Sequence, residues 1–337
     1  MSQVFPTAFN QTVGSTDRLE LLTQPAFRGS VLMNLDAHLF VANSLVKESI
    51  PKGFMFKEYI RYSNIGSEIH DVGDEVTAMG TRRQKRRIFL DDRPRVTMDS
   101  FDDIEEFLSD MSAQQKTAER MGVELAQAME VEAIKLPILA ARTPETDADF
   151  IGGGIDGNGG TVSVGAPATT PAARAANLLT KLDEIDQYWF SISMNDPRRT
   201  VLIDSPIWYA LRDLDDVFPG THPFFSNEVT KMASPDPSAM ADINATLFYK
   251  GFAIIRSQHA NRVFNTNRSG DRFRPGNFIN TVGVVYAPEA AALIQSRGIM
   301  TEAWRQPANL VNNVMASMLL GGGTIYAEKA IEIVITP

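Results

Sequence analysis

Residues 282–335 read VGVVYAPEAAALIQSRGIMTEAWRQPANLVNNVMASMLLGGGTIYAEKAIEIVI. The stretch begins with an apolar run that is typical of a buried strand. Pro288 then suits the first turn of a helix, and Pro307 suits the start of a second one. The three glycines after Leu320 are typical of a helix end, and the last apolar run predicts a closing strand. We therefore expect strand, helix, helix and strand, in that order.

The region before this ending alternates between helix and strand signals. The sequence predicts a helix over 172–190, a buried strand in RTVLIDS, a helix from PIWYALRDL, and a bent strand or strand pair in TLFYKGFAIIRS. No internal repeat is present. Mixed order of this kind indicates the α+β class.

A long helix is expected upstream, beginning near Ser100. The segment SFDD offers an N-cap with Asp103 at the third position. Acidic residues fill the first turns, where the helix dipole favours anions. Two apolar stripes then continue to Pro137, which should kink or end the helix. Two stripes indicate a helix that is covered on two sides.

A two-stranded excursion precedes this helix. In GFMFKEYIRY, Phe54, Phe56, Ile60 and Tyr62 fall on one side of an alternating pattern. The chain returns through TRRQKRRIFLDDRPR, residues 81–95, into strand-like IFL and RVTM. A lone hairpin is not stable in water, so this one needs a packing partner.

The return strand is basic although the chain is acidic, with 32 Lys and Arg against 41 Asp and Glu. It lacks the interleaved aromatic residues of a nucleic-acid patch, since only Phe89 is close. A localisation signal would normally lie in a flexible segment, and a plain solvated face also remains open. We favour a charged protein contact, whose candidate residues are Glu68, Asp71, Asp74, Glu75, Arg82, Arg83, Lys85, Arg86 and Arg87.

Bulk properties exclude several classes. There is no Cys, which rules out disulfides and thiolate metal sites. No apolar run reaches the roughly 18 residues of a membrane helix, and the N-terminus lacks the pattern of a secretory signal. A net charge of −9 argues against a nucleic-acid coat.

Chemical motifs are weak throughout. GGGIDG at 152–157 formally matches a dinucleotide fingerprint, but no strand leads into it and no helix follows. We interpret the Gly-, Pro- and Thr-rich segment 143–171 as an exposed loop or flap, and we expect its part 152–160 to be mobile and to tolerate insertions. The four histidines have no metal-ligand spacing. Helix-start electrostatics accounts for the acids near residue 103. We therefore expect no catalytic, cofactor or metal site.

The order of elements, and above all the ending, resembles the major capsid protein of tailed bacteriophages with the Hong-Kong-97-type fold, in its podovirus-like form. The resemblance covers nearly the whole chain in order, although each local motif is weak. It implies a spine helix at about 112–141 and an extended β-hairpin loop. The implied division is an N-terminal arm at 1–51, the extended loop at 52–98, a peripheral domain at 99–171 and 295–307, and an axial domain at 172–294 and 308–337.

The resemblance also implies a function. Such a protein self-assembles through pentamers and hexamers into an icosahedral shell around double-stranded DNA, without sequence-specific DNA binding and without a membrane. A scaffolding protein, a portal and a cement protein are the implied partners, and the virion is the implied location after synthesis in the host cytoplasm. No residue pair for covalent cross-links is identified. The alternatives are an encapsulin-like nanocompartment shell around a cargo enzyme, an enzyme with an unrecognised site, and a free nucleic-acid-binding protein.

Overall fold

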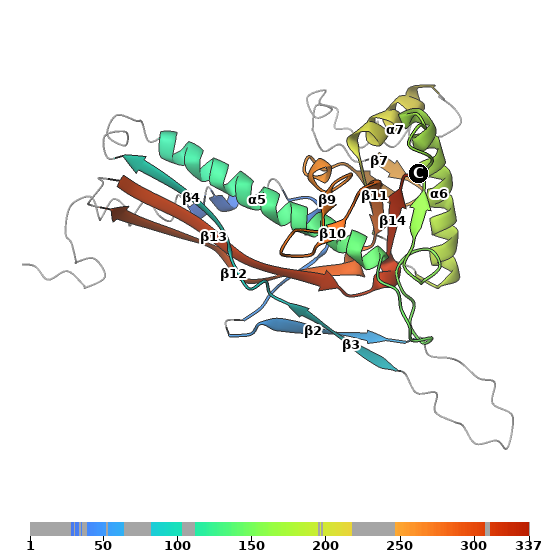
Figure 1. Cartoon of the computed structure of the whole chain (residues 1–337), viewed down its shortest axis with the longest axis horizontal. Coiled ribbons are helices and arrows are strands. Elements are labelled where there is room, and N and C mark those ends of the chain that lie inside the picture. The colour runs from blue at the N-terminus through green and yellow to red at the C-terminus, as the bar shows by residue number, and fades with distance from the viewer. Residues whose placement is uncertain are drawn as a thin grey trace, which may run out of the picture.

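A computed structural model describes residues 28–29, 31–33, 35, 39–51, 53–63, 82–102, 112–194, 196, 198–217, 247–306 and 311–336. Its framework is two β-sheets joined by one long helix (Figure 1). The strands of the first sheet lie in the order β1-β12-β13-β4. Their bounds are Val46–Ser49 for β1, Ala291–Gln306 for β12, Val311–Thr324 for β13 and Arg95–Asp102 for β4.

Strands β12 and β13 correct the expected helices of the C-terminal ending. They pair antiparallel from Ala291 with Thr324 to Gln306 with Val311, and only Pro288–Ala290 forms a short 3-10 turn, η3. Long-range pairing with β1 and β4 overrides the local helix signals of Pro288 and Pro307. Apolar runs of this length do not distinguish a buried strand from a helix.

The three glycines lie inside β13 instead of ending a helix. A Cβ on Gly321 would stand 2.7 Å from the Cα of Leu90, and one on Gly322 would stand 2.7 Å from Leu136 Cδ1. Separations under about 3 Å force a neighbour to move. Glycine is therefore required here because two other parts of the chain approach the strand closely.

Helix α5, Ser112–Ala141, lies along one face of this sheet (Figure 1). Met121, Leu125 and Met129 are buried in the core beneath it. The extent matches the spine helix implied by the resemblance, but the predicted start at Ser100 is wrong, because Ser100 belongs to β4 and pairs with Asn313. Residues 103–111, with the remaining acids of the expected first turns, lie outside the described part. Pro137 does not end the helix, which continues to Ala141.

The second sheet has the order β5-β14-β11-β6-β8-β7. Alternate residues serve its two faces: Leu202, Val284 and Ala330 belong to the core with α5, whereas Val201, Val285 and Ile331 belong to the core with α6 and α7. Burial on both faces explains the continuous apolar runs of the sequence. The bounds are Thr161–Ser163 (β5), Arg199–Ile203 (β6), Leu247–Tyr249 (β7), Phe252–Ile255 (β8), Thr281–Tyr286 (β11), Ala330–Val334 (β14), Pro171–Ser191 (α6) and Ser205–Val217 (α7).

These bounds confirm the predicted helices at 172–190 and after residue 205, and the predicted strands between them. The remaining described elements are short: α3 at Val41–Ser44, β9 at Asn267–Arg268, β10 at Gly276–Asn277, η2 at Ala260–Arg262 and η4 at Ala327–Lys329. No helix in the described part of the chain is both long enough and apolar enough to span a membrane.

The first glycines of the Gly-rich segment are packed, which corrects its interpretation as an exposed loop at these positions, although Asp156 and Asn158 beside them are exposed. Gly152, Gly153 and Gly154 are buried at the C-terminal end of α5. The amide of Gly153 donates to Thr143 O at 2.8 Å, and that of Gly154 donates to Ala330 O at 3.1 Å. A Cβ on Gly153 would stand 2.6 Å from Ala141 O. The glycines serve close backbone packing, so an inserted tag should disturb the fold.

Candidate subunit-contact site

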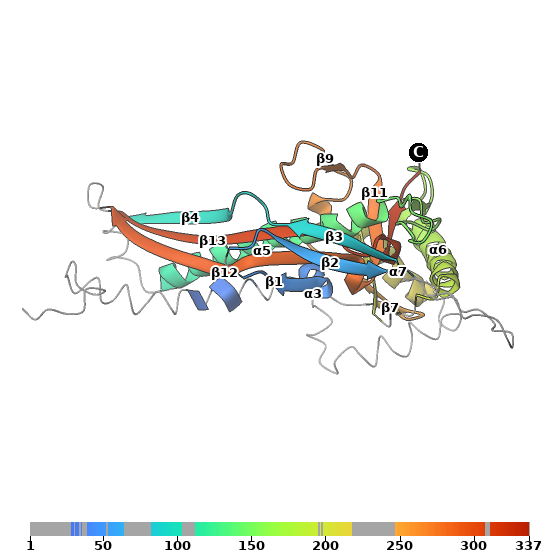
Figure 2. The same cartoon turned by 90° about the horizontal axis from the view of Figure 1, so that it is seen from below.

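The predicted hairpin is present as its own two-stranded sheet, β2 (Phe56–Tyr62) with β3 (Arg83–Phe89). The strands pair antiparallel from Phe56 with Phe89 to Tyr62 with Arg83. The hairpin lies on the side of the four-stranded sheet away from α5 (Figures 1 and 2). Its connecting segment, residues 64–81, lies outside the described residues, and so do the candidate acids Glu68, Asp71, Asp74 and Glu75.

The two faces of the hairpin differ in chemistry. Alternation along the strands separates an inner face from an outer face. The inner face turns toward the rest of the chain and includes the buried Arg61 and Ile88, with Lys57, Tyr59, Gln84 and Arg86 partly buried. The outer face carries Phe56, Glu58, Ile60, Tyr62, Arg83, Lys85, Arg87 and Phe89. All of these are exposed except Glu58, which is partly buried.

The bases of the outer face contact groups within the same hairpin. Arg87 donates to Glu58 Oε1 at 2.7 Å, and Lys85 Nζ lies 3.7 Å from the same carboxylate. The hydrogen bond from Arg87 lowers the pKa of Glu58. Arg83 lies over the ring of Tyr62 at 5.5 Å. Exposed pairs of this kind contribute little to stability, so the outer charges remain available to a second molecule.

The other two candidate bases reach beyond the hairpin to the loop that follows α5. Arg86 Nη2 lies 2.9 Å from Glu145 Oε2, and Arg82 Nη1 lies 2.7 Å from Asp149 Oδ2. The structure thus divides the basic run between two faces and two sets of acids. None of these acidic partners is among the acids predicted from the sequence. Glu58 could have been found from the cross-strand register, whereas no sequence signal links Arg86 to Glu145.

The most enclosed charge of the hairpin is Arg61, whose side chain is only 2% exposed. It donates to Glu328 Oε2 at 2.7 Å, to Ile151 O at 2.6 Å and to Glu145 Oε2 at 3.2 Å. Its guanidinium also lies over the ring of Phe150 at 5.1 Å. The alternation in GFMFKEYIRY predicts only the side of the strand on which Arg61 lies and not its partners, so the sequence does not single it out.

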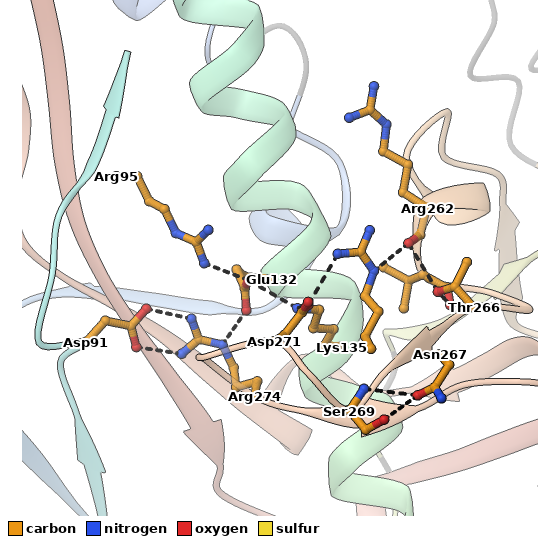
Figure 3. Close-up of polar contacts among 12 residues, drawn as sticks. Asp91, Arg95, Glu132, Lys135, Arg262, Thr266, Asn267, Ser269, Asp271 and Arg274 are labelled. Atoms are coloured by element: carbon orange, nitrogen blue, oxygen red, sulfur yellow. Dashed lines mark hydrogen bonds and ion pairs between the residues drawn. The ribbon is translucent and has the colours of Figure 1, made fainter. Parts of the chain in front are cut away.

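A second polar network holds the root of the hairpin, where β3 leads into β4 (Figure 3). Arg274 makes a bidentate pair with Asp91, at 2.9 and 2.7 Å, and also donates to Glu132 of α5 at 2.7 Å. Arg95 and Lys135 donate to the same glutamate at 2.7 and 3.2 Å. The carboxylate of Glu132 thus ties the root of the hairpin to the long helix.

The network continues to the β9–β10 turn. Lys135 donates to Asp271 Oδ2 at 2.5 Å, and Arg268 lies 3.2 Å from the same atom. Burial alone would raise the pKa of Asp271, but its bonds to Lys135 and Arg268 outweigh burial and lower that pKa. Arg272 of the same turn pairs with Asp92, on the linker that follows β3. Although Arg95 Nε is buried without a hydrogen-bond partner, a polar network with this many shared partners favours one arrangement of its elements.

A buried carboxylate anchors the start of the described chain to α5. Glu130 accepts the amides of Phe40, Val41 and Ala42 at 3.3, 2.7 and 3.1 Å. Burial raises the pKa of Glu130, although these amides oppose the shift. Ser44 and Tyr286 share a hydrogen bond of 2.6 Å beside it. The group is a structural anchor without an opening to solvent. Among the described residues, no three His, Asp or Glu side chains are placed to hold a metal ion.

In the described part of the chain, the four-stranded sheet also carries a strip of exposed apolar side chains. Register places Val96 and Met98 of β4 on the same face as Met300 and Trp304 of β12. All four are exposed. The opposite face carries Ala316, which is fully buried in the core that includes α5. The strip therefore faces away from α5, as the hairpin does (Figure 2).

The sequence matches no family model and no curated protein. Solved structures do match. The capsid of cyanophage P-SCSP1u has a TM-score of 0.65 at 17% identity, covering 87% of this chain and 86% of that one. The mature capsid of bacteriophage PhiM1 has a TM-score of 0.65 at 13% identity, covering 88% and 87%. The capsid of Ralstonia phage GP4 has a TM-score of 0.56 at 8% identity, covering 89% and 90%.

These alignments span nearly the full length of both partners, so the likeness concerns the whole arrangement of sheets and spine helix. The α+β class and the phage capsid architecture expected from the sequence are confirmed. This chain has the fold of bacteriophage major capsid proteins.

Proposed function

We propose that the chain is a major capsid protein, a virion component that self-assembles into an icosahedral shell around double-stranded DNA. The observation that carries the proposal is the outer face of the hairpin. Phe56, Ile60, Tyr62 and Phe89 stand exposed there on a two-stranded sheet. Monomeric proteins rarely leave a contiguous apolar patch rimmed by charge without a partner. The role is structural and calls on no catalytic residue.

The strip on the four-stranded sheet is the surface that we assign to the neighbouring copy. It offers Val96, Met98, Met300 and Trp304, with the exposed Glu302 between the last two. The outer face of the hairpin offers apolar side chains with bases between them. Two different, complementary patches on one chain make a head-to-tail contact, and such contacts close into rings. Pentamers and hexamers are rings of this kind.

The finer organisation is part of the same proposal. We assign residues 1–51 to an N-terminal arm and 52–98 to the loop that extends over a neighbour. The peripheral domain is 99–171 with 295–307, and the axial domain is 172–294 with 308–337. We make one exception to this division: β13 pairs with β12 over Val311–Thr324 and with β4 over Val311–Met318, so we expect 311–324 to move with the peripheral unit. A scaffolding protein, a portal and a cement protein are the proposed partners.

Electron microscopy of the expressed chain tests this function. The wild-type protein should form closed shells or tubes. Ile60→Glu replaces an apolar side chain of the outer face by a carboxylate, which the contact would have to strip of water, and should abolish them, whereas the matched control Ile60→Val should assemble normally. A wild-type chain that stays monomeric at every concentration would contradict the proposal. Shells that form around a cargo protein would instead indicate a nanocompartment.

A further inference from the structure

We propose that Arg61 is a clasp which presets the direction of the hairpin, so that each subunit presents its outer face ready for a neighbour. The inference rests on the proposed function of that outer face. It assigns Arg61 as a positioning residue: the side chain points inward, away from the surface that would touch the next copy.

The clasp joins three parts of the chain that are distant in sequence. Arg61 comes from β2, Glu145 from the loop after α5, and Glu328 from η4 beside β14. The guanidinium lies between two aromatic rings, at 5.1 Å from that of Phe150 and 5.8 Å from that of Tyr326. The planar fork of arginine matches such a set of acceptors, which a lysine ammonium would not.

Two neighbours on the inner face reinforce the clasp. Gln84 accepts from Arg61 at 3.2 Å and donates to Glu145 at 3.3 Å. Arg86 donates to Glu145 at 2.9 Å. Arg61, Gln84 and Arg86 therefore converge on one carboxylate, Glu145, which is only 8% exposed. A network satisfied in this way holds one geometry and resists partial opening.

Swinging the hairpin away would leave the acceptors without their cation. Glu328 is only 16% exposed. Burial raises its pKa, and the charge of Arg61 opposes that shift. Breaking an enclosed charge pair is costly because a charge remains without compensation. Moving the outer bases leaves no enclosed charge without compensation, since Arg83 and Lys85 are exposed. The hairpin is thus fixed from the inside and free on the outside.

A preset hairpin changes the energetics of association. Ordering a flexible segment at the moment of contact reduces affinity, and a segment that is ordered beforehand avoids that cost. Loss of the clasp should therefore act on the assembly threshold more than on the final contacts. Shells should still form, but only at a higher subunit concentration.

The test uses the double variant Arg61→Gln/Glu328→Gln, which removes both charges and keeps polar side chains. Hydrogen exchange is measured on unassembled full-length subunits. The amides of β2 and β3 should exchange at least about tenfold faster, whereas those of β6 and β11 should not change. The critical concentration for assembly should rise by about tenfold or more. Arg83→Gln, on the outer face, is the matched control and should leave the exchange unchanged.

Arg61→Lys provides a second reading if the double variant is too unstable. This variant keeps the positive charge but loses the planar guanidinium, so the β2 and β3 amides should exchange at a rate between those of the wild type and the double variant. Unchanged exchange in β2 and β3 would overturn the clasp. Faster exchange with an unchanged critical concentration would overturn its role in presetting assembly. If the wild type formed no shells, the proposed function would fail, whereas the exchange result would still decide the clasp.

Discussion

The six-stranded sheet and the hairpin differ in where their large apolar side chains lie. The sheet unit encloses its largest apolar side chains, and Trp189 and Phe252 have no exposed surface. The hairpin encloses a charge and displays its rings: Arg61 is 2% exposed, whereas Phe89 is 59% exposed. The same chain, in the same solvent, thus builds one region with its apolar groups inside and another with them outside.

The difference teaches where each region finds its partner. The sheet unit meets the apolar faces of α6 and α7 from its own chain, so its core is complete in the single subunit. The hairpin meets its own chain through the polar contacts of Arg61 and through Ile88, which packs in a small apolar cluster with Ile294 and Ile325; the rings of its outer face take no part in that contact. Its rings are left for a second molecule. Measurements on the isolated subunit and on the assembly should therefore rank substitutions in the two regions differently.

The largest expected effect on the isolated subunit is at Trp189. Trp189→Ala removes a ring from a complete core and should lower the free energy of unfolding by about 3–5 kcal/mol. Phe89→Ala should lower it by less than about 1 kcal/mol, because the ring is exposed. Urea denaturation of the two variants measures both values. A cost at Phe89 equal to that at Trp189 would mean that the hairpin is already covered within one chain.

A smaller effect should separate the two faces of the hairpin. Arg86→Glu sets a carboxylate against Glu145 and should cost on the order of 2 kcal/mol in the isolated subunit. Arg86→Gln, which keeps a hydrogen-bond donor toward Glu145 without placing a like charge beside it, should cost less and is the matched control. The outer pair Arg83→Glu/Arg87→Glu should lower subunit stability by no more than about 1 kcal/mol, since it sets a carboxylate directly opposite Glu58 on the exposed face, and should block assembly. Normal particles from the outer variant at low and high salt would show that these bases are a solvated face.

The smallest effect concerns Glu130, and it depends on pH. Burial raises its pKa in the folded state, so the unfolded chain ionises first as pH rises. The free energy of unfolding of the wild type should therefore fall relative to Glu130→Gln as pH rises through the ordinary glutamate range to the folded pKa, and then level off. Urea titrations from about pH 4 to pH 7 measure this difference. A difference in stability between wild type and Glu130→Gln that stays constant over this pH range would contradict the expectation.

The elements that the sequence predicts correctly are those with a local signal. The alternation in GFMFKEYIRY predicts β2 and the shared face of Phe56, Ile60 and Tyr62. The helices α6 and α7 follow from their periodicity. The prediction of helices in the C-terminal ending is wrong, because strand pairing between distant residues such as Asn313 and Ser100 leaves no signal in the local sequence. The overall architecture was predicted by the resemblance to phage capsid proteins and not by these local signals.

The sequence predicts only part of the candidate site. The basic strand was identified by composition alone, and its split into two faces follows from strand alternation. Its described partners could not be derived, since Glu145 lies far along the chain and enters through tertiary packing. Whether the acids between residues 64 and 81 form inter-subunit pairs stays a prediction. The sequence does not single out Arg61, because an arginine in a strand is ordinarily exposed to solvent.

The order of strands in the four-stranded sheet has a consequence for biosynthesis. Its inner partners, β12 and β13, are translated last, yet β1 and β4 pair with them at Ala292 and Val311. At about 5–20 residues per second, the ribosome needs roughly 10 to 40 s to pass from the end of β4 to the strand that completes it. During that interval the apolar underside of α5 lacks its sheet. Folding dominated by such distant pairings is slow, and each newly made subunit must be kept from aggregating until its C-terminal strands emerge.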